Sequence, residues 1–262
     1  MPWFFIENEI DTASFNIEGE NARHISKSLR MKKGEELTLI SPGGIQYDCA
    51  VREVSGDIVG VNILHSKMCE NEPDAEVTLY QAFPKGDKME LIIQKCVELG
   101  IKRIVPFISA RCVSRPDKKS LAKKIIRWQK IAKEAAAQSR RGIIPEIAQP
   151  VSFNEAVKNS KVNEKNIIFY ELGGDSLKNI IGKHPKTIGY FVGSEGGFEE
   201  KEIETALNNG IETATLGKRI LRAETAPIAA LSIIMYELGE MDKISINGKE
   251  FNNDRNYLRN EN

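Results

Sequence analysis

The chain has 262 residues, of which 41% are hydrophobic and 28% are charged, and its 37 basic side chains balance its 37 acidic ones. This composition is typical of an ordinary globular protein with one large domain or two small ones. No stretch approaches the roughly 18 apolar residues that span a bilayer, and the first seven residues lack the basic leader of a signal peptide. We therefore exclude a membrane-spanning protein and expect a cytoplasmic one.

The cysteines and histidines show no spacing that would bind a metal. None of the four cysteines stands in a C-x-x-C pair, and the three histidines form no ligand cluster with them. We expect reduced structural thiols and no metal site. The residues concerned are Cys49, Cys69, Cys96, Cys112, His24, His65 and His184.

Short β-type runs broken by turn residues dominate the chain up to residue 70. Strands are predicted at 37–40, 45–51 and 58–64, and a Ser-Pro-Gly-Gly turn separates the first two. Their spacing predicts a small β-barrel domain over residues 1–70. A short helical piece between residues 19 and 33 carries the basic side chains Arg23, Lys27 and Arg30.

A polar, acidic segment with one proline, residues 71–76, is predicted to be a linker. After it, residues 77–244 alternate between strands and helices, which predicts an α/β domain with a mostly parallel sheet. The final residues, 245–262, are polar and rich in asparagine, and are predicted to be a disordered tail. The predicted strands are 77–83, 103–108, 166–170, 187–192 and 213–216, and the predicted helices are 86–99, 121–138, 199–209 and 226–238.

A glycine-rich loop, Gly-Ser-Glu-Gly-Gly-Phe at 193–198, follows a strand and precedes a helix. Glycines there let the backbone approach a ligand and supply free N–H groups. The alternative is a tight turn that uses glycine for a positive φ. The spacing does not match the dinucleotide fingerprint G-x-G-x-x-G, and the Lys-Ser/Thr of a P-loop is absent.

A second loop, residues 216–227, also joins a strand to a helix and combines Arg219, Arg222 and Glu224 with apolar side chains. Thr225 is predicted to cap the following helix, which tolerates Pro227 in its first turn. Ligands in α/β sheets bind outside the carboxyl ends of the strands. Two such loops in succession therefore favour a ligand site over a merely polar loop.

The segment from residue 111 to residue 141 is strongly basic, with eleven lysines or arginines against two acidic residues. Within its helix, an apolar stripe of residues 121, 125, 128, 132 and 135 faces the core, and most basic side chains lie off that stripe. A run this one-sided favours polyanion binding over a merely solvated helix face.

At these segments the sequence resembles the ribosomal RNA small subunit methyltransferase E family, which belongs to the SPOUT class and makes N3-methyluridine at position 1498 of 16S rRNA. The resemblance covers nearly the whole chain up to about residue 242. The family usually has Pro where Ser194 stands, often Glu where Ala137 stands, and Gly where Arg140 stands. The matching segments are 24–31, 85–90, 94–100, 128–132, Gln138-Ser139 with Arg141 and Pro145, 193–197 and 216–226.

The resemblance implies a PUA-like N-terminal barrel that binds RNA and a C-terminal SPOUT domain tied in a trefoil knot. It also implies a homodimer with the active site across the subunit interface. S-adenosylmethionine is the implied cofactor, with main-chain groups reading the adenine edge and apolar side chains covering its faces. The implied cofactor residues are Leu172, Gly193, Ser194, Glu195, Gly197, Leu216, Leu221, Arg222, Thr225 and Ala226.

Methyl transfer to N3 of uracil requires the N3 proton to leave, and the resulting anion carries its charge on O2 and O4. An arginine near these oxygens would stabilise that charge. Arg222 is the first candidate and Arg30 the second. Glu224 would accept the proton or orient Arg222, or would simply pair with an arginine and hold the loop.

Basic side chains from both predicted domains are expected to hold phosphates of 16S rRNA within the 30S particle. Specificity is expected from RNA shape and a splayed-out base. Three alternatives stay open: a related enzyme that methylates a ribose 2′-hydroxyl or a tRNA base, a non-catalytic RNA-binding protein, and a nucleotide- or phosphate-binding enzyme. The expected phosphate contacts are Arg23, Lys27, Arg30, Arg111, Lys123, Arg127 and Arg141.

Overall fold

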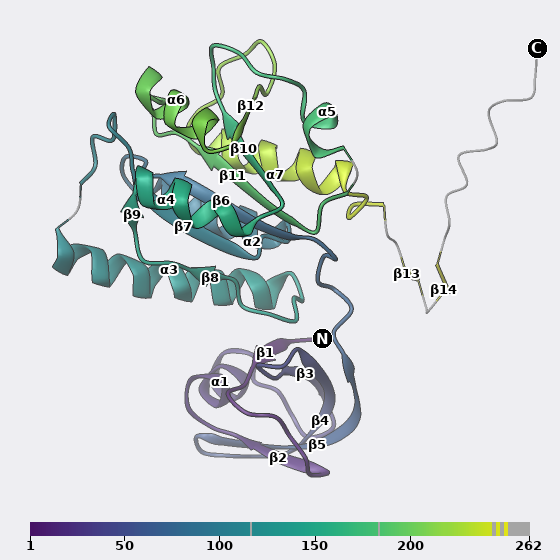
Figure 1. Cartoon of the computed structure of the whole chain (residues 1–262). Helices are drawn as coiled ribbons and strands as arrows, with labels where there is room; N and C mark the ends of the chain where they lie inside the picture. The colour runs from purple at the N-terminus through teal and green to yellow at the C-terminus, as the bar shows by residue number, and fades with distance from the viewer. Residues whose placement is uncertain (116, 183, 243–244, 247–248, 251–262) are drawn as a thin grey trace, which may run out of the picture.

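The computed structural model describes residues 1–115, 117–182, 184–242, 245–246 and 249–250. Figure 1 shows two sheets, a smaller N-terminal one and a larger one flanked by helices, with helix α3 between them. The smaller sheet has the strand order β1-β3-β4-β5-β2, and all its pairs are antiparallel except β1 with β3. Its strands are β1 Trp3–Phe5, β2 Ser14–Ile17, β3 Glu36–Ile40, β4 Ile45–Ser55 and β5 Ile58–Met68.

Strand β4 confirms the alternation in its sequence, because Tyr47, Cys49 and Val51 are buried and the residues between them are not. Strand β3 is buried on both faces: Leu37 and Leu39 pack in the N-terminal core, whereas Ile40 belongs to the core of the larger domain. The N-terminal sheet therefore shares apolar contact with the rest of the chain.

The basic helical piece consists of α1 Gly19–Arg23 followed by a π-helical turn, η1 His24–Ser28. Ala22 and Ile25 anchor it in the N-terminal core, while Arg23 and Lys27 are exposed. The piece therefore packs through its apolar side and presents its basic side chains to solvent.

The larger sheet has seven strands, and every recorded pair is parallel. The strand order is β12-β10-β11-β6-β7-β8, and β9 also pairs with β7. A mostly parallel α/β sheet is therefore confirmed. The strands are β6 Glu76–Ala82, β7 Arg103–Ile108, β8 Glu146–Ile147, β9 Val151–Ser152, β10 Lys165–Phe169, β11 Thr187–Val192 and β12 Glu212–Ala214.

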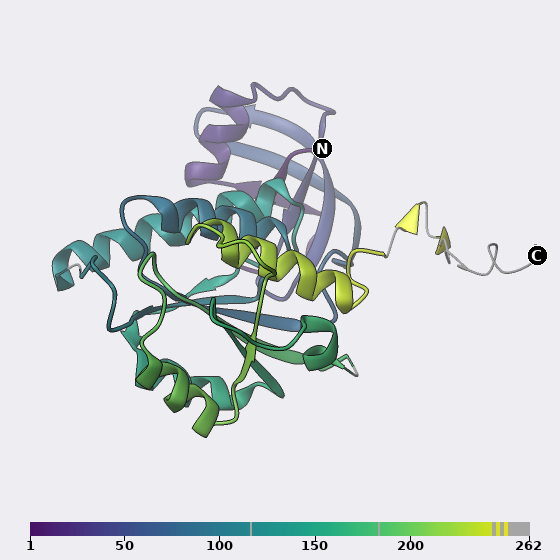
Figure 2. The same ribbon diagram turned by 90° about the horizontal axis from the view of Figure 1, so that it is seen from above.

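Helices cover both faces of this sheet (Figure 2): α2, α3 and α7 lie on one face, and α4 and α6 on the other. Helix α3 begins where the Asp117 carboxylate accepts hydrogen bonds from the backbone N–H groups of Lys119 and Ser120. The helices are α2 Lys88–Glu98, α3 Lys118–Gln138, α4 Phe153–Asn159, α5 Leu177–Ile181, α6 Glu200–Asn208 and α7 Thr225–Glu237.

Two sequence expectations about helices were incomplete or wrong. Helices α4 and α5 were missed, although the Ser152 and Glu155 capping box at the start of α4 is a readable signal. The cap predicted at Thr225 is wrong, because α7 begins at Thr225 itself and has no side-chain cap. The backbone carbonyl of Arg222 instead accepts from the N–H groups of Thr225 and Ala226.

The predicted disordered tail lies mostly outside the described residues. At its start, β13 Ser245–Ile246 pairs with β14 Lys249–Glu250 in an antiparallel ladder. At the other end of the predicted second domain, Glu76 of the predicted linker already belongs to β6. No helix in the described ranges is long and apolar enough to cross a membrane.

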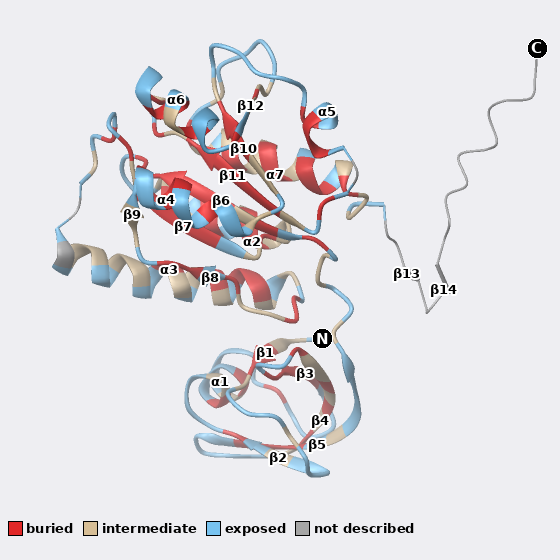
Figure 3. Ribbon diagram, in the orientation of Figure 1, coloured by how far each residue is buried: buried red, intermediate tan, exposed pale blue. Residues whose placement is uncertain are grey.

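Aromatic rings fill the centre of the larger core. Figure 3 shows that residues along the strands of the larger sheet are buried. The ring of Phe107 is fully buried and lies parallel to that of Phe198, with centroids 6.3 Å apart. Phe153 and Phe191 contact the same ring at 5.7 and 6.1 Å. Phe107 therefore joins β7 and β11 to α4 and to the start of the α6 region.

We expect Phe107→Ala to lower the free energy of unfolding by about 3–5 kcal/mol, because it leaves a cavity among three aromatic rings. Urea denaturation measures this loss. Leu207→Ala on the exposed side of α6 is the control, with an expected change within about 0.5 kcal/mol. Equal losses for the two variants would contradict the packing described above.

Candidate functional site

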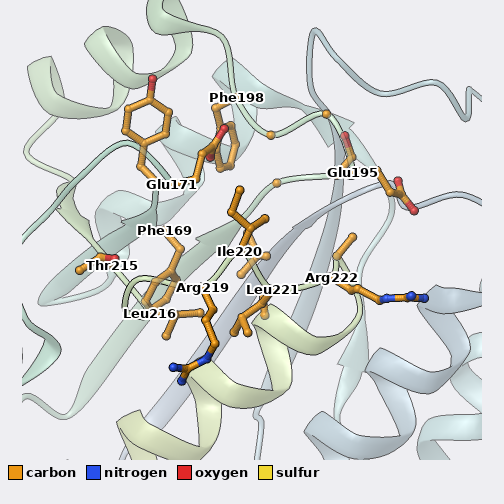
Figure 4. Close-up of a pocket in the computed structure, with 18 of the residues that line it drawn as sticks. Phe169, Glu171, Glu195, Phe198, Thr215, Leu216, Arg219, Ile220, Leu221 and Arg222 are labelled. Atoms are coloured by element: carbon orange, nitrogen blue, oxygen red, sulfur yellow. The ribbon is translucent and has the colours of Figure 1, made fainter.

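Three chain segments meet at one edge of the parallel sheet: the ends of β10 and β11, and the loop after β12. Because these strands pair in parallel, their carboxyl ends lie side by side. They enclose a cavity of about 620 Å³ (Figure 4). It is lined by Lys88, Phe169, Tyr170, Glu171, Val192, Gly193, Ser194, Glu195, Gly196, Gly197, Phe198, Thr215, Leu216, Gly217, Lys218, Arg219, Ile220, Leu221, Arg222, Ala223 and Ala226.

The glycine-rich loop is a tight turn and also one wall of this cavity. The N–H of Gly197 donates to the carbonyl of Ser194 at 3.0 Å, and Gly197 has a φ of 64° that favours glycine. A Cβ at Gly197 would lie 2.6 Å from Oε1 of Glu171. The loop is therefore a tight turn that needs glycine at position 197, and it also lines the cavity.

Arg111 holds the glycine-rich loop from outside. Its guanidinium donates to the carbonyl of Gly196 at 3.1 Å, and the Ser194 hydroxyl donates to the carbonyl of Arg111 at 3.5 Å. A Cβ at Gly196 would lie 2.9 Å from the Cβ of Arg111. Arg111 therefore contacts the loop that bounds the cavity, and Ser194 adds a hydrogen bond that proline could not make.

The loop after β12 supplies the apolar wall opposite the glycine-rich loop. Figure 4 shows Leu216, Ile220 and Leu221 on this loop, with Arg219 and Arg222 leaving it in different directions. Ile220 is 88% exposed, so a large apolar side chain faces solvent beside the cavity. An apolar ligand surface packed here would remove that side chain from water.

Lys88, the first residue of α2, joins the two loops. Its ammonium lies 2.9 Å from a carboxylate oxygen of Glu195 in the glycine-rich loop and 2.9 Å from one of Glu224 before α7. The backbone N–H of Lys85 also donates to Glu195 at 3.1 Å. We call Lys88, Glu195 and Glu224 the ionic clamp. The sequence did not predict Lys88 as a site residue, because it lies more than 100 residues before both carboxylates.

The ionic clamp shifts the acidity of its members. The ammonium of Lys88 lowers the pKa of Glu224 below its usual value, and both carboxylates raise the pKa of Lys88. For Glu195, burial raises the pKa, but hydrogen bonds from Lys88 and from backbone N–H groups outweigh it and the pKa is lowered. A carboxylate with a lowered pKa is a weak base, so Glu224 is poorly suited to remove a proton.

Eight of the ten residues expected to bind the cofactor line the cavity. Leu172 and Thr225 do not: Leu172 is 76% exposed beside the wall residue Glu171, and Thr225 is exposed at the start of α7. Phe169 and Tyr170 were missed, although their position at the end of a predicted strand is a usable signal. Arg30 lies in the N-terminal domain with a φ of 53° and does not line the cavity.

The expected phosphate contacts differ in their availability. Arg23 and Lys123 are exposed without a recorded ion pair, whereas Lys27 pairs with Asp57 at 3.1 Å and Arg127 with Glu90 at 2.7 Å, all at the surface. Arg141 is a correction: its side chain is 3% exposed and bound to Glu72, so it cannot reach an RNA phosphate.

In the described part of the chain, no three histidine, cysteine or acidic side chains gather as a metal site would require. All four cysteines are free thiols, and Cys49, Cys96 and Cys112 are buried. Burial raises the pKa of the Cys49 thiol to about 12, which makes it unreactive at neutral pH.

Comparison with known proteins shows which family this chain is similar to. The model of an RNA methyltransferase domain matches residues 70–235, and that of an RNA methyltransferase PUA domain matches residues 17–64. The ribosomal RNA small subunit methyltransferase E of Bacillus subtilis is 36% identical over 248 residues, which cover 90% of this chain and 97% of that protein. The same enzyme from Buchnera aphidicola is 30% identical over 92% of this chain and 95% of the relative.

Two solved structures share the fold. The ribosomal RNA small subunit methyltransferase E of Neisseria gonorrhoeae, bound to S-adenosyl methionine, matches with a TM-score of 0.81 and 33% identity over 90% of this chain and 97% of that one. A putative methyltransferase of Legionella pneumophila, in complex with the same cofactor, matches with a TM-score of 0.80 and 31% identity, covering 88% and 96%. The chain belongs to the ribosomal RNA small subunit methyltransferase E family.

Proposed function

We propose that this protein transfers a methyl group from S-adenosylmethionine to N3 of the uridine at position 1498 of 16S rRNA, within the 30S particle. The observation that carries the proposal is the cavity between the glycine-rich loop and the loop after β12, in a chain of this family. The family relationship supports rRNA as the substrate, and the finer choice of uridine N3 rests on the resemblance described above.

The cavity suits this cofactor in size and in chemistry. Its volume lies within the usual range of small-molecule sites, about 300–1,000 Å³. Leu216, Leu221 and Ala226 offer apolar surface for an adenine ring, and backbone groups of Gly193 and Gly217 lie in the wall. Glu171 adds a carboxylate without a recorded ion pair for a cationic group of the ligand. When bound, the cofactor supplies the electrophilic methyl group.

Arg222 is proposed to stabilise the uracil anion. It lines the cavity, is exposed, and has no recorded ion-pair partner among the described residues. Its guanidinium is therefore available for O2 or O4 of the base as negative charge develops there. Glu224 is assigned to the ionic clamp rather than to proton removal, because Lys88 lowers its pKa and so makes it a weaker base. The N3 proton would then pass to solvent water as the methyl group is transferred.

RNA is proposed to lie over the exposed basic side chains of both domains. Arg23, Lys27 and Arg30 would contact phosphates from the N-terminal domain, and Lys123 and Arg127 from α3. Such contacts fix the register of the RNA without reading its sequence.

Several finer features of the architecture also remain part of the proposal: closure of the N-terminal sheet into a PUA-like barrel, a C-terminal trefoil knot, and the domain boundaries at 1–70, 71–76 and 77–244. The loop after β12 and α7, which return to contact β11 and α2, are the segments that such a knot would thread. A homodimer is proposed too, and Ile233 and Tyr236 give α7 an exposed apolar patch for it.

The proposed reaction is tested by incubating the protein with labelled S-adenosylmethionine and 30S particles that lack the modification. The RNA is then digested and the labelled nucleoside identified. Label in N3-methyluridine at one site supports the proposal. Label on a ribose or another base keeps the enzyme class and discards the assignment, and RNA binding without transfer indicates a non-catalytic binding protein.

Arg222→Ala should lower kcat for methyl transfer about 10²–10³-fold, as expected for loss of one group that stabilises developing charge. The Kd for S-adenosylmethionine, measured by calorimetry, should change far less. Arg103→Ala removes an arginine that is exposed and paired with Glu146, away from the cavity, and is the matched control. A kcat for Arg222→Ala equal to that of the control would exclude the assigned role.

Lys88→Met should lower Tm at pH 7, because it leaves two carboxylates without their shared cation. The pKa of Glu195 and Glu224 is lowered from 4.5 by the clamp, so its stabilisation is present above that value and is lost as pH falls through the lowered values. The Tm difference between wild type and Lys88→Met should therefore shrink below pH 4.5 in calorimetric scans. A difference that is constant across this range would contradict the clamp.

A further inference from the structure

The segment between the two sheets is bound along its length. The N–H of Cys69 donates to the carbonyl of Gly44, the Asn71 side chain donates to the carbonyl of Arg140 at 2.7 Å, and the N–H of Asp74 donates to Glu240 at 3.1 Å. A Cβ at Gly100 would lie 2.7 Å from Pro73, so this proline packs on the end of α2. The predicted linker is therefore docked on the larger domain.

An ion pair between the buried guanidinium of Arg141 and the partly exposed carboxylate of Glu72 lies at the centre of this docking. Two nitrogens of the Arg141 guanidinium donate to the two carboxylate oxygens of Glu72, at 3.2 and 2.5 Å. The third nitrogen donates to the carbonyls of Val97 and Ile101, at 3.2 and 2.6 Å. The guanidinium therefore joins the linker to the carboxyl end of α2, and each of its nitrogens has a partner.

The carboxylate of Glu72 also accepts several hydrogen bonds. Besides Arg141, its Oε1 accepts from the backbone N–H groups of Gly142 at 2.8 Å and Ile143 at 3.3 Å. The N-terminal domain reaches the same loop directly, because the indole N–H of Trp3 in β1 donates to the carbonyl of Arg141 at 2.9 Å. We call Trp3, Glu72, Arg141 and the loop 140–143 the interdomain joint.

Burying a guanidinium together with part of its carboxylate partner is costly, and an apolar contact of similar volume is often no less stable than a buried ion pair. Such a pair, however, tolerates few geometries, because removing or shifting Glu72 leaves the buried guanidinium of Arg141 without its counter-ion. A flexible linker would need no such pair. The desolvation cost of the pair has a purpose if the interdomain joint fixes one orientation of the N-terminal domain relative to the larger domain.

We propose that Glu72 and Arg141 are positioning residues that hold the N-terminal domain at one angle, so that RNA bound by it arrives at the cavity in register. The inference rests on the proposed function. Arg23, Lys27 and Arg30 belong to the N-terminal domain, whereas Lys123 belongs to α3, so the orientation of the two domains sets how far apart the two groups of phosphate contacts lie. A joint that is set before binding spares the complex the entropy of ordering two domains.

Two variants loosen the joint in different ways. Glu72→Gln removes the charge and keeps the shape of the side chain, and Trp3→Phe removes only the indole N–H. Glu146→Gln makes the same chemical change as the first variant in an exposed ion pair with Arg103 and is the matched control. For each protein, X-ray scattering gives the radius of gyration, calorimetry gives the Kd for S-adenosylmethionine, and steady-state methylation of 30S particles gives KM and kcat.

We expect Glu72→Gln to raise the KM for 30S particles about tenfold and Trp3→Phe about threefold, with a larger radius of gyration and an unchanged Kd for the cofactor. The kcat should stay near that of wild type. A raised KM with an unchanged kcat is a combination that a general loss of fold would not produce. An unchanged KM in a variant whose scattering shows loosened domains would overturn the proposal. Unchanged scattering in both variants would overturn it as well.

If Glu72→Gln does not fold, Trp3→Phe alone carries the test, because it deletes one hydrogen bond and no charge. If the wild-type protein binds 30S particles but transfers no methyl group, the proposed function fails. In that case the Kd for 30S particles replaces KM, and the joint is judged by the same comparison among the three variants.

Discussion

The parallel pairing of β10 with β11 and β12 is the constraint on which the site depends. It places three carboxyl strand ends side by side, so that loops far apart in the sequence become the walls of one cavity. The ionic clamp then couples those walls, because Lys88 on α2 binds carboxylates of the glycine-rich loop and of the segment before α7. Sheet pairing sets where the loops begin, and the clamp sets how they face each other.

Much of the fold could be predicted from sequence, because its long elements carry clear patterns. The apolar stripe of α3 and the alternation in β4 gave the right element type, and the predicted strands and long helices of the larger domain end within three residues of the observed ones. Helix α5 and the two-residue strands β8 and β9 were missed, because elements this short contain too few residues to show a period. The left-handed φ of Arg140 was not predicted either, because an arginine gives no local signal for that conformation.

The candidate site was predictable only where its residues are local in sequence. The glycine-rich loop and the loop after β12 line the cavity as expected, because each is a contiguous strand-to-helix loop. Lys88 and Arg141 depend on ion pairs with carboxylates that lie 107 and 69 positions away in the sequence. Charge alone assigned Arg141 to RNA, whereas burial against Glu72 places it between the domains. A basic residue type thus carries no information about whether its partner is an RNA phosphate or a carboxylate of the same chain.

The central claim is that the two clamped loops form one cofactor site at the edge of the parallel sheet. Amide NMR spectra recorded during titration with S-adenosylmethionine test it most directly. We expect the largest shifts at residues 193–198 and 216–226, with smaller ones at the start of α2 where Lys88 lies. Shifts confined to other segments, or no shifts at saturating cofactor, would contradict it.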